Sequence, residues 1–418
     1  MPWLLAGYVW LYLHRPFEYW TFLGTLQIER LYMIFTVVVW MMTPGKWWPS
    51  NWLHAAFLYF TVALFTCWVI SPYPQELGEK IWEDHCKVAV FYILMVTTIR
   101  DAAGLRRMLL AYFVALFLYQ SHSLLEFICG RYEYRQGTVR MKGVDTTFGD
   151  PNTFTATVLH AMPFLLPFWF VPKNKNERPA IVCYVLLGLL CILLSRSRRA
   201  FLGIMFMALV LVLRSKRRWS LLLLGLLLSP LAFCLLPDSI QDRILTLVDS
   251  SYGPQIAIAS RDSRLKFFLI GMDLFNQYPL TGIGPGAFAL AAGTGLQSHN
   301  LYAQTAAEMG TFGVSALVFI VFCFWRNSRE IARLYKQHPW WEQDFVYHVA
   351  RSAWLAVVLL LFMGAGGHNL YRYNWLWFGA FQILALQIAR RRAVAEAAGE
   401  LPEPEPWAPR QPSYHYAA

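Results

Sequence analysis

The sequence predicts an all-α integral membrane protein with about twelve transmembrane helices. Of its 418 residues, 57% are hydrophobic and only 15% are charged, and the mean hydropathy is +0.39. A soluble chain of this length would carry far more charge and divide into two or three domains. Apolar runs of about 15–21 residues recur along the whole chain, close to the length that crosses a bilayer. The 18 Trp and 21 Tyr residues suit the two interfaces of a membrane.

The expected spans follow one another with short connections. They are residues 2–13, 28–42, 52–70, 86–99, 108–128, 153–171, 180–195, 200–213, 219–236, 306–325, 349–365 and 374–389. Arg15 and Pro16 interrupt the first, and residues 17–27 are compatible with part of a broken helix. The spans divide the chain into an N-terminal membrane part (1–236), a large periplasmic loop containing helices (237–305), a C-terminal membrane part (306–392) and a disordered cytoplasmic tail (393–418).

Basic residues in short loops predict the orientation. The loops near residues 100–107, 173–178, 214–218, 326–336 and 390–392 fall on one side, which the positive-inside rule makes cytoplasmic. Loop 129–152, the junction 195–199, loop 237–305 and the turn 364–373 then lie outside. These outer segments are also rich in Lys and Arg, against the rule, so an anionic partner at the outer leaflet is expected.

The junction SRSRRA at 195–200 is the first candidate binding site. Arg196, Arg198 and Arg199 stand between two apolar spans with almost no loop. An ordinary basic turn would explain them on the cytoplasmic side, but on the outer side they favour binding of a phosphate, which guanidinium groups contact at two points. Arg140 belongs to an outer loop that would help to collect anionic lipid or sugar.

Three further motifs lie in or beside the long outer loop. The segment SRDSRLKFF at 260–268 opens a predicted helix with Arg261 and Arg264, and alone it fits a solvated surface helix. The segment PLTGIGPG at 279–286 lacks the Walker lysine, so a tight turn is expected rather than nucleotide binding. SHNLY at 298–302 places His299 at the mouth of a span, where it suits a general base or merely a helix cap.

Other candidate residues have milder explanations. Glu308 lies close to the span that follows His299, where a carboxylate needs a partner. A second HNLY string, at 368–371, fits an interfacial aromatic belt and ranks below His299. Asp150 or Asn152 in TFGDPN at 147–152 is expected to cap the next helix, with Pro151 setting the turn. No CxxC pair or metal-ligand spacing is present, and no cleavable signal peptide is apparent.

Taken in order, these strings resemble the O-antigen ligase and polymerase superfamily. That pattern has a PN turn, a Ser-Arg pair at a span junction, and a large loop with an Arg-containing helix, a P-x-x-G-x-G-x-G turn and an HN-x-Y…E-x-G string. The match covers about residues 148–325 in detail. Phe268 stands where the family often has Trp after the loop arginine, and the crowding at 196–199 leaves the matching arginine open between Arg196 and Arg198.

The resemblance implies a GT-C-like glycosyltransferase in the bacterial inner membrane, with its site facing the periplasm. The donor would be a glycan on undecaprenyl diphosphate, with no metal, no other cofactor and no nucleic acid. The implied catalytic residues are His299, Arg264 and Arg198. The implied substrate-binding residues are Arg140, Asp150, Asn152, Arg196, Arg199, Arg261, Asn300 and Glu308. Ligation to lipid A-core is favoured over polymerisation or protein O-glycosylation, and an anionic-lipid transporter is the alternative outside the class.

Overall fold

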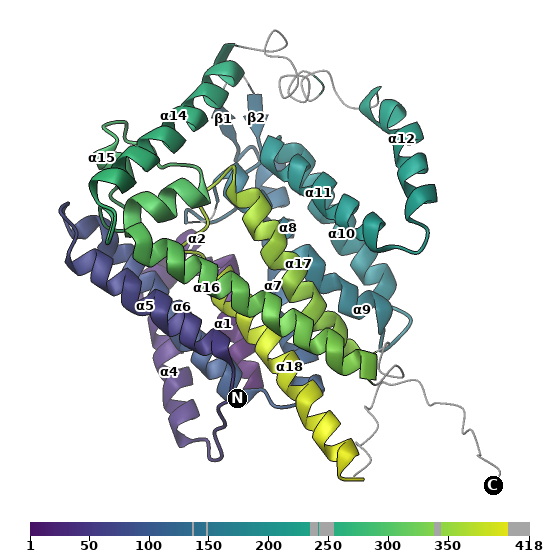
Figure 1. Ribbon diagram of the computed structural model, residues 1–418. Helices are drawn as coiled ribbons and strands as arrows, with labels where there is room; N and C mark the ends of the chain where they lie inside the picture. Colours follow the sequence, from purple (N-terminus) through teal and green to yellow (C-terminus); the bar gives the residue numbers. More distant parts are fainter. Residues whose placement is uncertain (136–137, 148, 235–240, 242–254, 338–343, 400–418) are drawn as a thin grey trace.

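The computed structural model describes residues 1–135, 138–147, 149–234, 241, 255–337 and 344–399. In this part the chain is almost wholly helical, as Figure 1 shows. The helices are α1 (Pro2–His14), α2 (Pro16–Tyr19), α3 (Thr21–Thr25), α4 (Ile28–Met42), α5 (Trp52–Val69), α6 (Glu76–Thr98), α7 (Ala102–Ile128), α8 (Pro151–Ala161), α9 (Leu166–Phe170), α10 (Glu177–Ser195), α11 (Arg198–Arg214), α12 (Arg218–Cys234), α14 (Gln255–Gln277), α15 (Phe288–Ala291), α16 (Leu301–Gln337), α17 (Phe345–Gly364) and α18 (Asn374–Ala397). A 3-10 turn, η1 (Met162–Leu165), joins α8 to α9, and strands β1 (Glu133–Arg135) and β2 (Thr138–Arg140) form an antiparallel hairpin.

Within the described residues, six helical segments are long and apolar enough to cross a membrane. They are α5, α7, the α8–α9 unit, α10, α16 and α17. Each of the twelve predicted spans overlaps a helix, but the others are shorter or more polar. The structure therefore confirms an all-α membrane protein, while the count of twelve spans stays a prediction.

The outer surface of the bundle is apolar. Only 28% of the most apolar 18-residue segment of α10 is buried inside the protein. Leu186 on α10 is 61% exposed, and Met205 on α11 is 67% exposed. Apolar surface of this extent is costly in water and stable in hydrocarbon, so the chain is a multi-pass membrane protein.

The core lies where α17 packs on α18, α1 on α7 and α5 on α16. Trp377 and Phe381 of α18 are fully buried there. The ring of Phe91 from α6 lies 4.9 Å from that of Trp377, and the ring of Tyr112 from α7 lies 6.0 Å from that of Phe381. Tilted and edge-on ring contacts of this kind fix helices that otherwise lack a hydrophobic driving force inside lipid.

Two helices extend beyond the spans predicted from hydropathy. Helix α6 begins at Glu76 rather than at residue 86, because its first three turns are charged and contribute nothing to the apolar run. Helix α16 begins at Leu301 rather than at residue 306 and continues to Gln337. Gly310 interrupts α16 with φ 57° and ψ −149°, so the segment before it is a separate short helix set at an angle.

The hairpin, the α10–α11 junction, the start of α16 and the turn 365–373 share one end of the bundle, here called the hairpin end (Figure 1). Arg140 Nε, where β2 ends, donates to Ser195 O at the end of α10, over 3.0 Å. The opposite end holds basic turns predicted to be cytoplasmic, where Arg390 pairs with Glu330 at 2.6 Å. The described loops named here therefore lie at two ends of the bundle, as predicted, while the membrane side that each end faces stays a prediction.

Candidate functional site

Asn152 ties the loop before α8 to the α10–α11 junction. Its side-chain oxygen accepts hydrogen bonds from Arg140 Nη2 at 3.1 Å and from Ser197 Oγ at 2.9 Å. Asp150 caps α8 by accepting from the backbone N–H of Asn152 and of Thr153, at 2.9 and 3.1 Å. The capping predicted from the PN turn is confirmed, and Asn152 additionally positions the arginine junction.

The three arginines of the junction are half-buried at the hairpin end. Arg196 ends α10 with φ 51°, a left-handed conformation that is uncommon outside glycine. Ser197 then caps α11, accepting from Ala200 N at 3.4 Å, so one helix follows the other with no intervening loop. This tight reversal brings Arg196, Arg198 and Arg199 together at one point of the surface, where their charges add.

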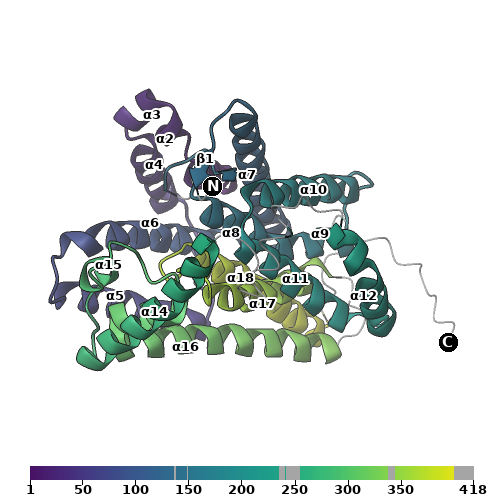
Figure 2. The same cartoon turned by 90° about the horizontal axis from the view of Figure 1, so that it is seen from above.

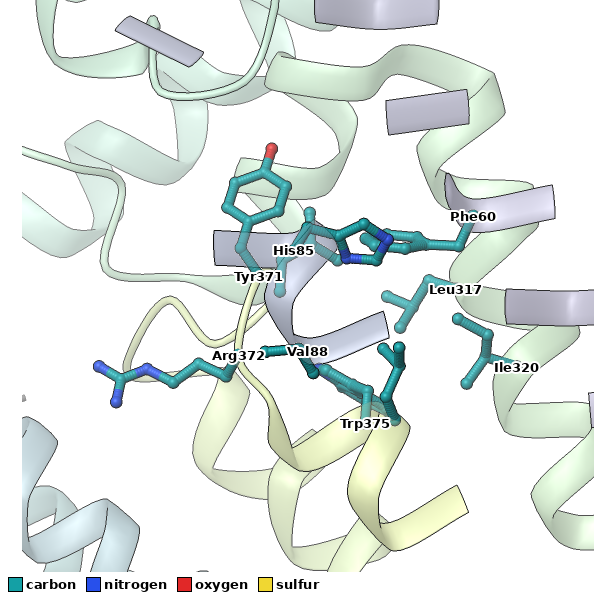
Figure 3. A pocket seen from close by; sticks show the side chains of 10 residues that line it. Phe60, His85, Val88, Leu317, Ile320, Tyr371, Arg372 and Trp375 are labelled. Atoms are coloured by element: carbon teal, nitrogen blue, oxygen red, sulfur yellow. The ribbon is translucent and has the colours of Figure 1, made fainter. Parts of the chain in front are cut away.

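The turn 365–373 brings a further arginine and a histidine to the same place. Arg199 packs against Gly367 so closely that a Cβ at that glycine would overlap the guanidinium. Arg372 donates from Nη2 to Thr153 Oγ1 at 3.1 Å, at the start of α8. Figure 3 shows the Arg372 side chain extending away from the other labelled residues, while the ring of Tyr371 points elsewhere. The turn therefore adds Arg372 to the arginines of the junction.

His299 and His368 lie side by side, with ring centroids 5.4 Å apart. His299 is exposed and adopts φ 51°, which is again a left-handed backbone. His368 is more deeply placed, and burial together with Arg372, His299 and Arg199 lowers the pKa of its imidazole to about 3. His368 is therefore neutral at physiological pH, and its Nδ1 is buried without a hydrogen-bond partner in the described part of the chain.

Asn300 fixes the position of His299 from two directions. Its Oδ1 accepts from the backbone N–H of Tyr302 and of Ala303, at 2.9 and 3.0 Å, and so caps α16. Its Nδ2 donates to Ala365 O at 3.1 Å, which joins the start of α16 to the end of α17. Asn300, and not His299, therefore caps α16, and the ring of His299 lies beside that of His368.

The glycine-rich turn 279–286 packs against α16 where that helix bends. Ile283 N donates to Ala307 O at 2.8 Å and Gly284 N to Glu308 O at 3.0 Å. Gly282 has φ +67°, and a Cβ there would lie 2.5 Å from Ala307 O. These glycines permit a close backbone approach. The structure supports the prediction of a tight turn.

Glu308 is fully buried behind this turn rather than open to the surface. Its Oε2 accepts from Tyr371 OH at 2.7 Å and from Gln304 Nε2 at 3.3 Å. Glu308 therefore connects α16 to the turn 365–373, which fits a positioning role better than direct contact with substrate. Binding of substrate by Glu308 stays a prediction.

Arg261 and Arg264 lie on α14, confirming a helix in the long loop, but their side chains fall outside the described residues. Two other residues were missed as candidates. Arg372 and His368 stand in a string that an aromatic belt explained adequately. The signal available in the sequence was the repetition of HNLY at 299–302 and 368–371, which marks the second string as a further candidate.

The fold and the site together define a multi-pass helical membrane protein with a cationic, histidine-containing site at one end. Residues 183–318 match the family model described as O-antigen ligase. This match, which runs from α10 to the middle of α16, confirms the resemblance to the O-antigen ligase and polymerase superfamily. No curated protein matches the chain.

Proposed function

We propose that this protein transfers a glycan from undecaprenyl diphosphate to an acceptor hydroxyl at the periplasmic face of the bacterial inner membrane. The observation that carries the proposal is that Arg140, the arginine junction, Arg372 and the His299–His368 pair share the hairpin end, with Arg199 and Arg372 lying near His368. Arginines suit a diphosphate, and a histidine suits the proton of a hydroxyl. The family match to residues 183–318 supports the same chemistry.

In the proposed reaction the acceptor oxygen attacks the anomeric carbon of the donor sugar. The bond between that carbon and the phosphate oxygen breaks, and the lipid diphosphate leaves with the bonding electrons. Arg198 or Arg196, together with Arg264, stabilises the charge that develops on the diphosphate. His299 takes the proton from the acceptor hydroxyl. Neutral His368 beside it fixes the position of its ring, with Arg199 and Arg372 behind.

The favoured acceptor is lipid A-core, which would make the protein an O-antigen ligase. A second lipid-linked repeat would make it a polymerase, and a Ser or Thr side chain would make it a protein O-oligosaccharyltransferase. All three use the same donor and site. A transporter of anionic lipid would also want outer arginines, but it should line its path with basic residues near the bilayer midplane. Turnover separates the two classes, since only a transferase forms product.

The test is transfer by the protein reconstituted in membranes with a lipid-diphosphate-linked glycan. Arg198→Lys keeps the charge but loses the planar two-point contact, so we expect about a ten- to hundredfold loss. Arg264→Lys should behave in the same way. Arg178→Lys is the matched control, because Arg178 lies at the opposite end and donates to Trp169 O at 3.2 Å. Full activity in both site variants contradicts the arginine clamp.

The same assay with a chelator tests whether a metal takes part. Among the residues that the structure describes, no group of three or more His, Cys, Asp or Glu comes together. We expect activity to persist with chelator, and its loss would favour a metal-assisted reaction. For the orientation, a reporter after Arg392 should behave as cytoplasmic and one inserted near residue 251 as periplasmic. Both on one side would contradict the proposed location.

A further inference from the structure

A polar cavity opens at the hairpin end, apart from the arginine–histidine site. It encloses about 1070 Å³, including the open solvent at its mouth, between the α1–α4 connection and the first turns of α6. Figure 2 shows α2, α3 and α4 on one side of α6. The residues that line the cavity belong to these helices and to the turns that join α1 to α4. One wall is formed by the charged first turns of α6, which precede the predicted span 86–99.

Most residues that line the cavity are charged, and their negative and positive charges nearly cancel. It carries five carboxylates and four basic side chains, so neither an anion nor a cation is strongly favoured. Several of these groups already pair with one another. Arg30 contacts Glu83 at 2.6 Å, and Lys87 contacts Glu83 at 3.1 Å and Asp84 at 3.6 Å. A ligand here therefore meets acceptors and donors alternating at short intervals.

Two opposite charges in the wall are deeply buried, which distinguishes the cavity from a solvated surface ladder. Arg15 and Glu29 are each only 8% exposed. Arg15 pairs with Glu18, whereas Glu29, among the residues that the structure describes, accepts only a weak hydrogen bond from Tyr8 OH at 3.5 Å. Burying a carboxylate is costly without good partners. Glu29 thus retains hydrogen-bonding capacity toward a ligand in the cavity.

Two sets of side-chain contacts connect the surroundings of the cavity to the proposed site. Glu18 accepts from Thr146 N and Thr146 Oγ1, each at 2.7 Å, in the loop that leads to Asn152. On the other side, the ring of Tyr12 lies 5.5 Å from that of Tyr373, the neighbour of Arg372. Glu18 and Tyr12 both contact Arg15 of the cavity wall, so side-chain contacts link the cavity to the segments that carry Asn152 and Arg372.

We propose that this cavity binds the acceptor, and that the part it binds is a neutral, hydroxyl-rich sugar. A sugar hydroxyl donates one hydrogen bond and accepts others, which matches carboxylates interleaved with guanidinium and ammonium groups. A phosphate would face the five carboxylates, and an amine would face the four cations. The proposal rests on the proposed glycan transfer and assigns its second substrate to residues distinct from the diphosphate clamp.

Binding of neutral sugars to the protein in lipid nanodiscs tests the cavity without requiring turnover. The probes are the trisaccharides of glucose and of N-acetylglucosamine, each also as its phosphate monoester, followed by saturation-transfer NMR. We expect at least one neutral trisaccharide to bind and its phosphate monoester to bind more weakly. Glu29→Gln and Asp84→Asn should each weaken binding about tenfold, since each replaces a charged hydrogen-bond acceptor by a neutral amide.

Asp273→Asn is the matched control, because Asp273 is an exposed carboxylate on α14 outside the cavity. Asp84→Asn keeps the test valid if Glu29→Gln does not fold, since the Asp84 side chain is 34% exposed. Unchanged binding in a folded cavity variant, absence of binding by both neutral sugars, or preference for the phosphate overturns the proposal. Cavity-dependent binding by a protein without transfer activity would instead refute the transferase function and leave the sugar site standing.

Discussion

The two HNLY strings have the same four residues and different surroundings. In the first, at 299–302, the histidine is exposed and the tyrosine is 44% exposed, donating to Leu361 O at 3.0 Å. In the second, at 368–371, the asparagine is 2% exposed and the tyrosine donates to the buried carboxylate of Glu308 at 2.7 Å. Identical local sequence therefore supplies an exposed edge in one place and a buried support in the other. Burial, and not residue type, separates the two roles.

The sharpest comparison is between the two histidines. His299→Ala should lower glycan transfer by about two to four orders of magnitude if His299 is the general base. His368→Ala should cost much less, because its neutral ring supports His299 without taking the proton. The measurement is the initial rate of transfer by reconstituted protein, with the folded state of each variant checked by its thermal unfolding. The reverse order would assign the base to the second string.

The two tyrosines compare the strings in stability. Tyr371→Phe removes a hydrogen bond to a buried carboxylate, so we expect the free energy of unfolding to fall by about 1.5–3 kcal/mol. Tyr302→Phe removes a bond to a backbone carbonyl and should cost about 0.5–1.5 kcal/mol. Denaturant titration in mixed micelles gives both values. Equal losses would mean that Glu308 does not hold the second string in place.

A fall in pH should destabilise the fold through His368 of the second string. The folded-state pKa of His368 is lowered to about 3, by burial and then by nearby positive charge, while the unfolded chain has the ordinary value near 6.5. Between these values the unfolded state binds more protons, so stability falls as the pH drops from about 6.5 toward 3. His368→Gln should flatten this part of the stability curve. A curve of unchanged slope contradicts the buried, neutral assignment.

The smallest expected effect concerns the cap of the first string. Asn300→Ala removes the acceptor for Tyr302 N and Ala303 N and should cost about 1 kcal/mol of stability. The variant should also lose activity beyond this cost, because the link from Asn300 to Ala365 positions His299. Thermal unfolding and the transfer rate, measured on the same preparation, separate the two effects. A destabilised variant with the wild-type rate would remove Asn300 from the positioning of His299.

Much of the fold could be predicted from the sequence because membrane helices are recognisable by their length and apolar composition. The helical class, the overlap of each predicted span with a helix and the two groups of loops were all predictable. The charged start of α6 was missed, since a hydropathy pattern marks where a helix meets lipid and not where it ends. The capping roles of Asp150 and the tight turn at 279–286 were predictable because they depend on neighbouring residues.

Sequence alone determined which residue types were available at the hairpin end: an arginine junction, two HNLY strings and a glycine turn. Only the tertiary structure decided which of them meet. The pairing of His299 with His368, the packing of Arg199 on Gly367 and the bond between Tyr371 and Glu308 join segments more than 60 residues apart. Such contacts depend on how helices pack, and helix packing is set by the shapes of many side chains at once. A local pattern carries no record of them.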